Sequence, residues 1–218
     1  MGVKFENRWL EDVAKKALNW PAEEDLTQEA LEKIKYVKIG RSNRFNNGYE
    51  VELSTEVPPE PFADTDGGDE WVYCLRGKNI EAFLNQERRN NLLNPSMFGF
   101  DDEEYNEAHS DAAQAAWENY KPHIVSGFDF LEVIALSQAE GMDATDRRAE
   151  RLFYELYRDI LHFTGVQVLR ITELVMPDYR VFQEMKQLRV LELVETHFTS
   201  DEGYECLKGL QQLACWLD

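Results

Sequence analysis

A short apolar motif, Leu-x-x-Leu-x-Leu, constrains the fold of this chain more than any other feature. It occurs from Val166 to Ile171 and again from Leu188 to Leu193, a step of 22 residues. An imperfect copy begins at Leu213, a step of 25 residues after Leu188. Alternating apolar positions are typical of a strand that buries one face. The spacing predicts short strands joined by compact return segments.

The segments between these strands carry apolar residues at intervals of three. The residues concerned are Met176, Tyr179, Phe182, Met185, Tyr204, Leu207 and Leu210. This spacing predicts helical or 3-10 return segments with one apolar side facing inward. A unit of one strand and one return segment cannot bury its apolar edge alone, so neighbouring units are expected to stack with parallel strands.

The N-terminal region contains an earlier copy of the motif, which follows two predicted helices. A helix with an apolar face is predicted from Phe5 to Leu18, and it ends before Pro21. A second, short helix is expected to begin with Thr27 as its N-cap. It leads into a strand at Tyr36–Ile39 whose motif starts at Ile34.

A period of 20 to 29 residues is typical of leucine-rich repeats. The region 166–218 resembles two such repeats and the strand of a third, and residues 3–40 resemble the helical N-terminal cap of bacterial internalin-like leucine-rich-repeat proteins. The residues that carry the likeness to the cap are Phe5, Leu10, Leu18, Asn19, Pro21, Leu26, Thr27, Leu31 and Ile34. The family's ninth-position Asn, which forms a hydrogen-bonded ladder, is replaced here by Ser42, Leu174 and Thr196. The ladder is therefore expected to be absent or makeshift, and a plain α/β domain remains the alternative.

The region 41–165 is harder to interpret. Strands are predicted in GYEVELSTEV, WVYCL and FDFLEVIALS, and helices in NIEAFLNQERRNNLL, DDEEYNEAHSDAAQAAWENY and ATDRRAERLFYELYRDILHF. Either this region is one inserted α/β segment, or it consists of irregular repeats, with Leu131 starting another motif. We favour an irregular α/β solenoid with parallel strands, a helical cap over 1–40, repeats over 166–218 and long insertions in its early units, in one compact domain.

The net charge of −19 is unevenly distributed. Eight acidic residues and no basic ones lie between Tyr49 and Glu70, and seven and none between Gly99 and Tyr120. The negative electrostatic field of these acidic segments repels nucleic acid and anionic membranes and favours a basic partner. No apolar run could span a membrane, and three cysteines without a CxxC pair suggest free thiols. We expect a cytoplasmic protein.

Few residues suggest chemistry. Asp64, Asp66 and Asp69 resemble a calcium loop that lacks its final glutamate, and Glu104, Glu107 and His109 lack metal-ligand spacing on a helix. The sequence has no phosphate loop and no hydrolase or zinc-protease motif. We therefore expect no cofactor, no metal and no enzymatic activity.

The resemblance implies a non-enzymatic protein–protein interaction module. The strand positions that point away from the core are its candidate contact residues: Tyr36, Lys38, Val168, Arg170, Val190 and Glu192. Arg170 and Glu192 are expected to be cross-strand neighbours, and Cys215 is expected to extend the apolar column. That column is either a contact surface for a protein partner or a second subunit, or it is covered by the middle of the chain. The alternatives are an acidic inhibitor or immunity-type protein that neutralises a basic partner, and an enzyme with a site in the acidic middle region.

Overall fold

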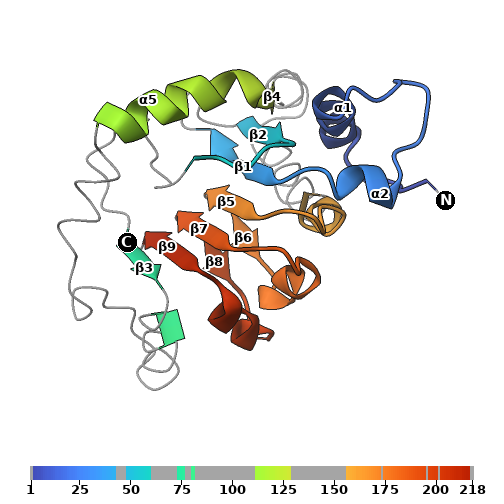
Figure 1. Cartoon of the computed structure of the whole chain (residues 1–218). Coiled ribbons are helices and arrows are strands. Elements are labelled where there is room, and N and C mark those ends of the chain that lie inside the picture. Colours follow the sequence, from blue (N-terminus) through green and yellow to red (C-terminus); the bar gives the residue numbers. More distant parts are fainter. Residues whose placement is uncertain are drawn as a thin grey trace.

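The computed structural model describes residues 2–42, 48–59, 73–76, 80–81, 111–128, 156–172, 174–194, 196–200 and 202–216. Within these ranges the chain is a mixed α/β protein built on an open seven-stranded sheet with the order β3-β9-β7-β5-β1-β2-β4 (Figure 1). Its strands are β1 (Tyr36–Ser42), β2 (Gly48–Ser54), β3 (Tyr73–Arg76), β4 (Val125–Phe128), β5 (Val168–Thr172), β7 (Val190–Val194) and β9 (Gln212–Trp216).

The four strands that carry the motif lie side by side in the middle of this sheet. β1 pairs with β5, β5 with β7 and β7 with β9, and all three pairs are parallel. The prediction that β5 and β7 are adjacent and parallel is therefore confirmed. The flanking strands run the other way, because β2 pairs antiparallel with β1, β4 with β2, and β3 with β9.

The same main-chain arrangement recurs where each of these parallel strands begins. The carbonyl oxygen of Lys35 accepts hydrogen bonds from the N–H groups of Gln167 and the following residue, at 2.9 and 3.1 Å. The carbonyl of Gln167 accepts the equivalent pair from Arg189 and its successor, at 2.8 and 3.0 Å. The carbonyl of Arg189 does the same for Gln211 and its successor, at 2.8 and 3.1 Å. Gln167, Arg189 and Gln211 are each 22 residues apart.

The expected start of the last motif is wrong. Leu213 pairs with Leu191 rather than with Leu188, so Leu210 begins the last motif and the step is again 22 residues. Cys215 consequently lies opposite Leu193 and does not extend the column of Val190. The physical reason is that the preceding 3-10 segment ends at Gly209 and the chain is already extended at Leu210.

Two return segments connect the last three strands. They contain the 3-10 helices η4 (Tyr179–Glu184) and η5 (Tyr204–Gly209), as the threefold spacing predicts. Before each helix a two-residue strand, β6 (Val175–Met176) or β8 (His197–Phe198), pairs with its counterpart in a small parallel sheet. The Thr196 hydroxyl lies 3.0 Å from the carbonyl oxygen of Ile171 on the neighbouring strand. Thr196 thus makes a contact at the ninth position of its motif.

The main core fills the space between the sheet and these return segments. Eight apolar side chains of the motif strands and return segments are buried in it: Leu169, Ile171, Phe182, Met185, Leu191, Leu193, Leu207 and Leu210. Leu188, the first residue of its motif, is only half-buried.

The N-terminal helices close one end of this core. α1 (Arg8–Ala17) begins after Asn7, whose side chain accepts a hydrogen bond from the N–H of Leu10, and α2 (Gln28–Leu31) begins after Thr27, as predicted. α1 packs so closely on β4 that a Cβ atom at Gly127 would lie 2.1 Å from a methyl group of Val13. Glycine is therefore required at this contact.

The middle of the chain does not add strands to the parallel stack in the described ranges. β1 lies directly beside β5, so no motif strand separates them. The chain between these two strands supplies β2, β3 and β4. It also supplies the helix α5 (Asp111–Tyr120) and its 3-10 extension η3 (Lys121–His123). The interpretation of this region as irregular repeats stays a prediction, with one inserted segment as its alternative. The motif at Leu131 and most of the last predicted helix lie outside the described residues, although 156–160 are helical. No helix in the described part of the chain is both long and apolar enough to cross a membrane.

Candidate interaction face

The parallel strands turn a second set of side chains away from the main core. In the first row Tyr36, Val168 and Val190 are register partners. In the second row Lys38, Arg170 and Glu192 are partners. We call these six residues the outer face. They are the residues predicted to contact a partner, and the structure does bring them together on one side of the sheet.

Arg170 and Glu192 form a bidentate ion pair within this face. The Arg170 Nε atom lies 2.7 Å from Oε2 of Glu192, and its Nη2 atom donates to Oε1 at 2.8 Å. The two residues are 3% and 4% exposed. Their predicted cross-strand contact is confirmed, but the pair is buried rather than solvated. A buried pair holds its geometry firmly, because separating it leaves a charge without compensation.

A second set of polar contacts lies beside this ion pair and involves Tyr36 and Lys38. The hydroxyl of Tyr36 donates a hydrogen bond to Glu52 at 3.1 Å, and the Lys38 ammonium lies 3.9 Å from a carboxylate oxygen of both Glu50 and Glu52. Burial raises the pKa of Tyr36 well above its usual value, and the nearby Arg170 opposes that rise. The phenol is therefore neutral at physiological pH and acts as a hydrogen-bond donor.

Helix α5 lies across the outer face (Figure 1). The rings of Trp117 and Tyr120 meet the Tyr36 ring edge-on, with centroids 6.4 and 6.0 Å away. Val168 and Val190 complete the same cluster and are 3% and 5% exposed. Two alternatives were open for this apolar column, and the structure shows that the middle of the chain covers it.

The hydroxyl of Tyr120 adds a polar anchor to this cover. It donates to the carbonyl oxygen of Glu56 at 3.0 Å, and burial raises the pKa of Tyr120. The aromatic residues of α5 were not among the predicted site residues. Their signal was present in the sequence, since Ala113, Trp117 and Tyr120 follow an i, i+4, i+7 spacing on one side of a helix.

Five of the six outer-face residues are buried in this conformation, and Lys38 is half-buried. A contact between another protein and the row of Tyr36, Val168 and Val190 therefore requires α5 to move. The role of the outer face in binding stays a prediction, and for the apolar row it requires a movement of α5.

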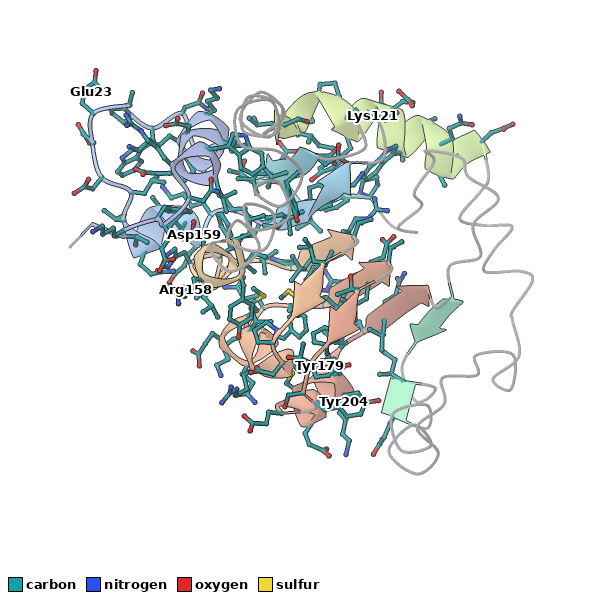
Figure 2. All side chains as sticks on the ribbon, turned by 180° about the vertical axis from the view of Figure 1, so that it is seen from behind. Glu23, Lys121, Arg158, Asp159, Tyr179 and Tyr204 are labelled. Atoms are coloured by element: carbon teal, nitrogen blue, oxygen red, sulfur yellow. The ribbon has the colours of Figure 1, made fainter. Side chains whose placement is uncertain are left out.

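The buried carboxylate of Asp159 holds the N-terminal segment in place. Asp159 is fully buried and accepts hydrogen bonds from the main-chain N–H groups of Glu6 and Asn7, at 2.9 and 2.7 Å. Figure 2 shows Asp159 beside Arg158 on the helical turn at 156–160. Burial raises the pKa of Asp159, while the two main-chain donors and His162 oppose the rise. Its contacts are main-chain anchors, so we assign it a structural role.

The remaining candidate residues concern metal binding and catalysis. Asp64, Asp66, Asp69, Glu104, Glu107 and His109 lie outside the described residues. The described ranges contain no group of three or more His, Cys, Asp or Glu residues that could hold a metal ion. Burial raises the pKa of the Cys206 thiol to about 11, so this thiol is protonated at neutral pH and is a poor nucleophile.

Comparison of the chain with models of protein families, with curated proteins and with solved structures finds no match in any of the three.

Proposed function

We propose that this chain is a non-enzymatic protein–protein interaction module of the leucine-rich-repeat type. The observation that carries the proposal is the recurrence, every 22 residues, of a strand start with the same pair of main-chain hydrogen bonds, at residues 167, 189 and 211. The 3-10 return segments and the Thr196 contact add to it. The likeness to leucine-rich repeats implies protein partners, while the fold alone does not define a function.

A second candidate function rests on charge. With a net charge of −19 and two long segments without a basic residue, the chain could act as an acidic inhibitor that neutralises a basic partner. Such binding would depend mainly on solvated charges, so it would weaken sharply with salt. Binding through an apolar surface would depend on salt only slightly.

The test is capture of partners by the tagged full chain from its own host, at about 0.05 and about 0.5 M salt, where the Debye length falls several-fold. We expect one protein to co-elute in stoichiometric amount at both salt concentrations, as identified by mass spectrometry. Loss of that protein at high salt would favour the acidic inhibitor instead.

A matched control removes proteins that bind any unfolded chain. Leu191 is fully buried in the main core, so Leu191→Asp places a charge there and unfolds the protein. Proteins captured by this variant as well are discounted. The interaction-module proposal fails if nothing is captured by the native chain alone.

A further inference from the structure

We propose that the outer face is a docking groove for an amphipathic helix of a partner protein, and that α5 occupies this groove as an internal substitute. The inference rests on the proposed function, because it names the surface through which the module would bind. It also names the chemistry of the partner: a basic helix with a small residue, a Trp and a Tyr at positions i, i+4 and i+7.

The first argument is that α5 and the main core are separate. The cluster under α5 comprises Tyr36, Trp117, Tyr120, Val168 and Val190, and it shares none of these residues with the main core. Within the described residues, the core between the sheet and the return segments is therefore complete without α5. Departure of the helix would expose one face of the sheet and leave the other face packed.

The second argument is the small contact that holds α5. Only Ala113, Trp117 and Tyr120 are buried among its ten residues, and a hydrogen bond from Tyr120 to Glu56 joins it to the loop after β2. The alanines at 112 and 115 are exposed. The extension η3 adds His123, whose Nδ1 atom lies 3.1 Å from a Glu56 carboxylate oxygen, and Ile124 packs against the same cluster. Another helix that presents the same three side chains and a cation near Glu56 can compete for these contacts.

The third argument is charge complementarity. The groove is edged by the carboxylates of Glu50, Glu52 and Glu56. The first two lie 3.9 Å from the Lys38 ammonium, and the third lies 3.1 Å from Nδ1 of His123 in η3. α5 itself carries Asp111 and Glu118 and no basic residue. Three carboxylates thus face one lysine and one histidine, so a basic helix with the same aromatic side would add opposite charge along this edge.

The groove also specifies the two aromatic rings. Tyr36, Val168 and Val190 give an apolar base with an aromatic edge, which suits a Trp ring. The carbonyl oxygen of Glu56 needs a hydrogen-bond donor three residues after the Trp. A Tyr hydroxyl supplies this donor and a Phe ring does not. The partner helix is thus expected to carry Trp-x-x-Tyr, as α5 does.

The experiment uses the full chain and a labelled peptide with the sequence of residues 111–124, in which Asp111→Lys and Glu118→Lys reverse the charge. The double variant Trp117→Ala/Tyr120→Ala empties the groove, and Gln114→Ala/Glu118→Gln changes only exposed positions of α5. Fluorescence anisotropy of the peptide measures binding. We expect the emptied variant to bind at least about tenfold more tightly than the native chain, because an internal occupant lowers apparent affinity by the fraction of molecules in which the groove is open.

The controls distinguish specific binding of the peptide in the groove from nonspecific binding. The exposed-position variant should bind as the native chain does, and a peptide that also lacks its Trp and Tyr should not bind the emptied variant. The proposal is overturned if the emptied variant unfolds cooperatively as before but does not bind the peptide. It is equally overturned if that variant no longer folds, because α5 is then part of the core.

The result also separates this inference from the proposed function. A native chain that captures a partner at high salt, together with an emptied variant that ignores the peptide, leaves the interaction module standing and places its surface elsewhere. Peptide binding to the emptied variant without any captured partner supports the groove and counts against the interaction-module proposal.

Discussion

At the scale of single residues, the buried ion pair of Arg170 and Glu192 makes the sharpest prediction. Arg170→Met leaves the Glu192 carboxylate buried without its cation, so the free energy of unfolding should fall by about 3–5 kcal/mol. The double variant Arg170→Met/Glu192→Leu should recover most of this loss, because no charge then lacks compensation. Urea unfolding of both variants measures the difference. A double variant as unstable as the single one would show that the pair stabilises through its geometry instead.

Asp159 predicts a dependence of stability on pH. Its folded pKa is raised by burial above the unfolded value, which is about 3.9 for Asp. The folded state therefore holds the proton more tightly, and this contribution to stability is complete below about pH 4 and is lost as the pH rises through the folded pKa. The stability advantage of the native chain over Asp159→Asn should shrink over that window in urea unfolding at several pH values. An advantage that grows with pH would mean that the main-chain donors outweigh burial.

The sequence predicted much of the outer face, and its limits are instructive at this scale. The alternation of the motif correctly placed Arg170 beside Glu192, because parallel strands with the same motif align residue by residue. It did not show that the pair is buried. Nor did it show that Trp117 and Tyr120 cover the neighbouring row of Tyr36, Val168 and Val190 from a distant part of the chain. No local pattern carries that information.

At the scale of elements, Thr196 tests the ladder between return segments. Its hydroxyl lies 3.0 Å from the carbonyl oxygens of both Ile171 and Val194, and it can donate to only one at a time. Thr196→Val should cost about 0.5–1.5 kcal/mol of stability through the lost hydrogen bond. Thr196→Asn offers two amide hydrogens, so it should be tolerated or stabilising in thermal unfolding. An Asn variant less stable than the Val variant would count against a repeat-like arrangement here.

Element types were easier to predict than register. Threefold spacing indicated the 3-10 segments η4 and η5 correctly, because residues at i and i+3 share one side of such a helix. The register of β9 was wrong because Leu210 also fits the threefold pattern, and the sequence alone did not show that it belongs to the next strand. Main-chain hydrogen bonds to Arg189 decide the matter.

At the scale of the whole molecule, the middle of the chain encloses the parallel strands. β2 and β4 extend the sheet beyond β1, β3 pairs with β9 at the opposite end, and α5 lies over the outer face (Figure 1). These placements depend on contacts between residues far apart in sequence, which periodicity does not reveal. The sequence thus indicated the central strands and the N-terminal helices but left the enclosing elements unplaced.

A duplication tests whether the central strands are equivalent units. Inserting a second copy of residues 188–209 after Gly209 should add one strand between β7 and β9, because each unit meets its neighbour through the same main-chain hydrogen bonds. β9 and β3 would then move outward together by about 4.8 Å, the spacing of adjacent strands. We expect unfolding to stay cooperative and the strand signal in circular dichroism to increase. The control is an insertion of the same 22 residues in scrambled order, which should lower the midpoint of thermal unfolding because it cannot pair. If both insertions are tolerated, the site is merely a permissive loop; if neither is, the strands are not interchangeable, and either result contradicts the repeat interpretation.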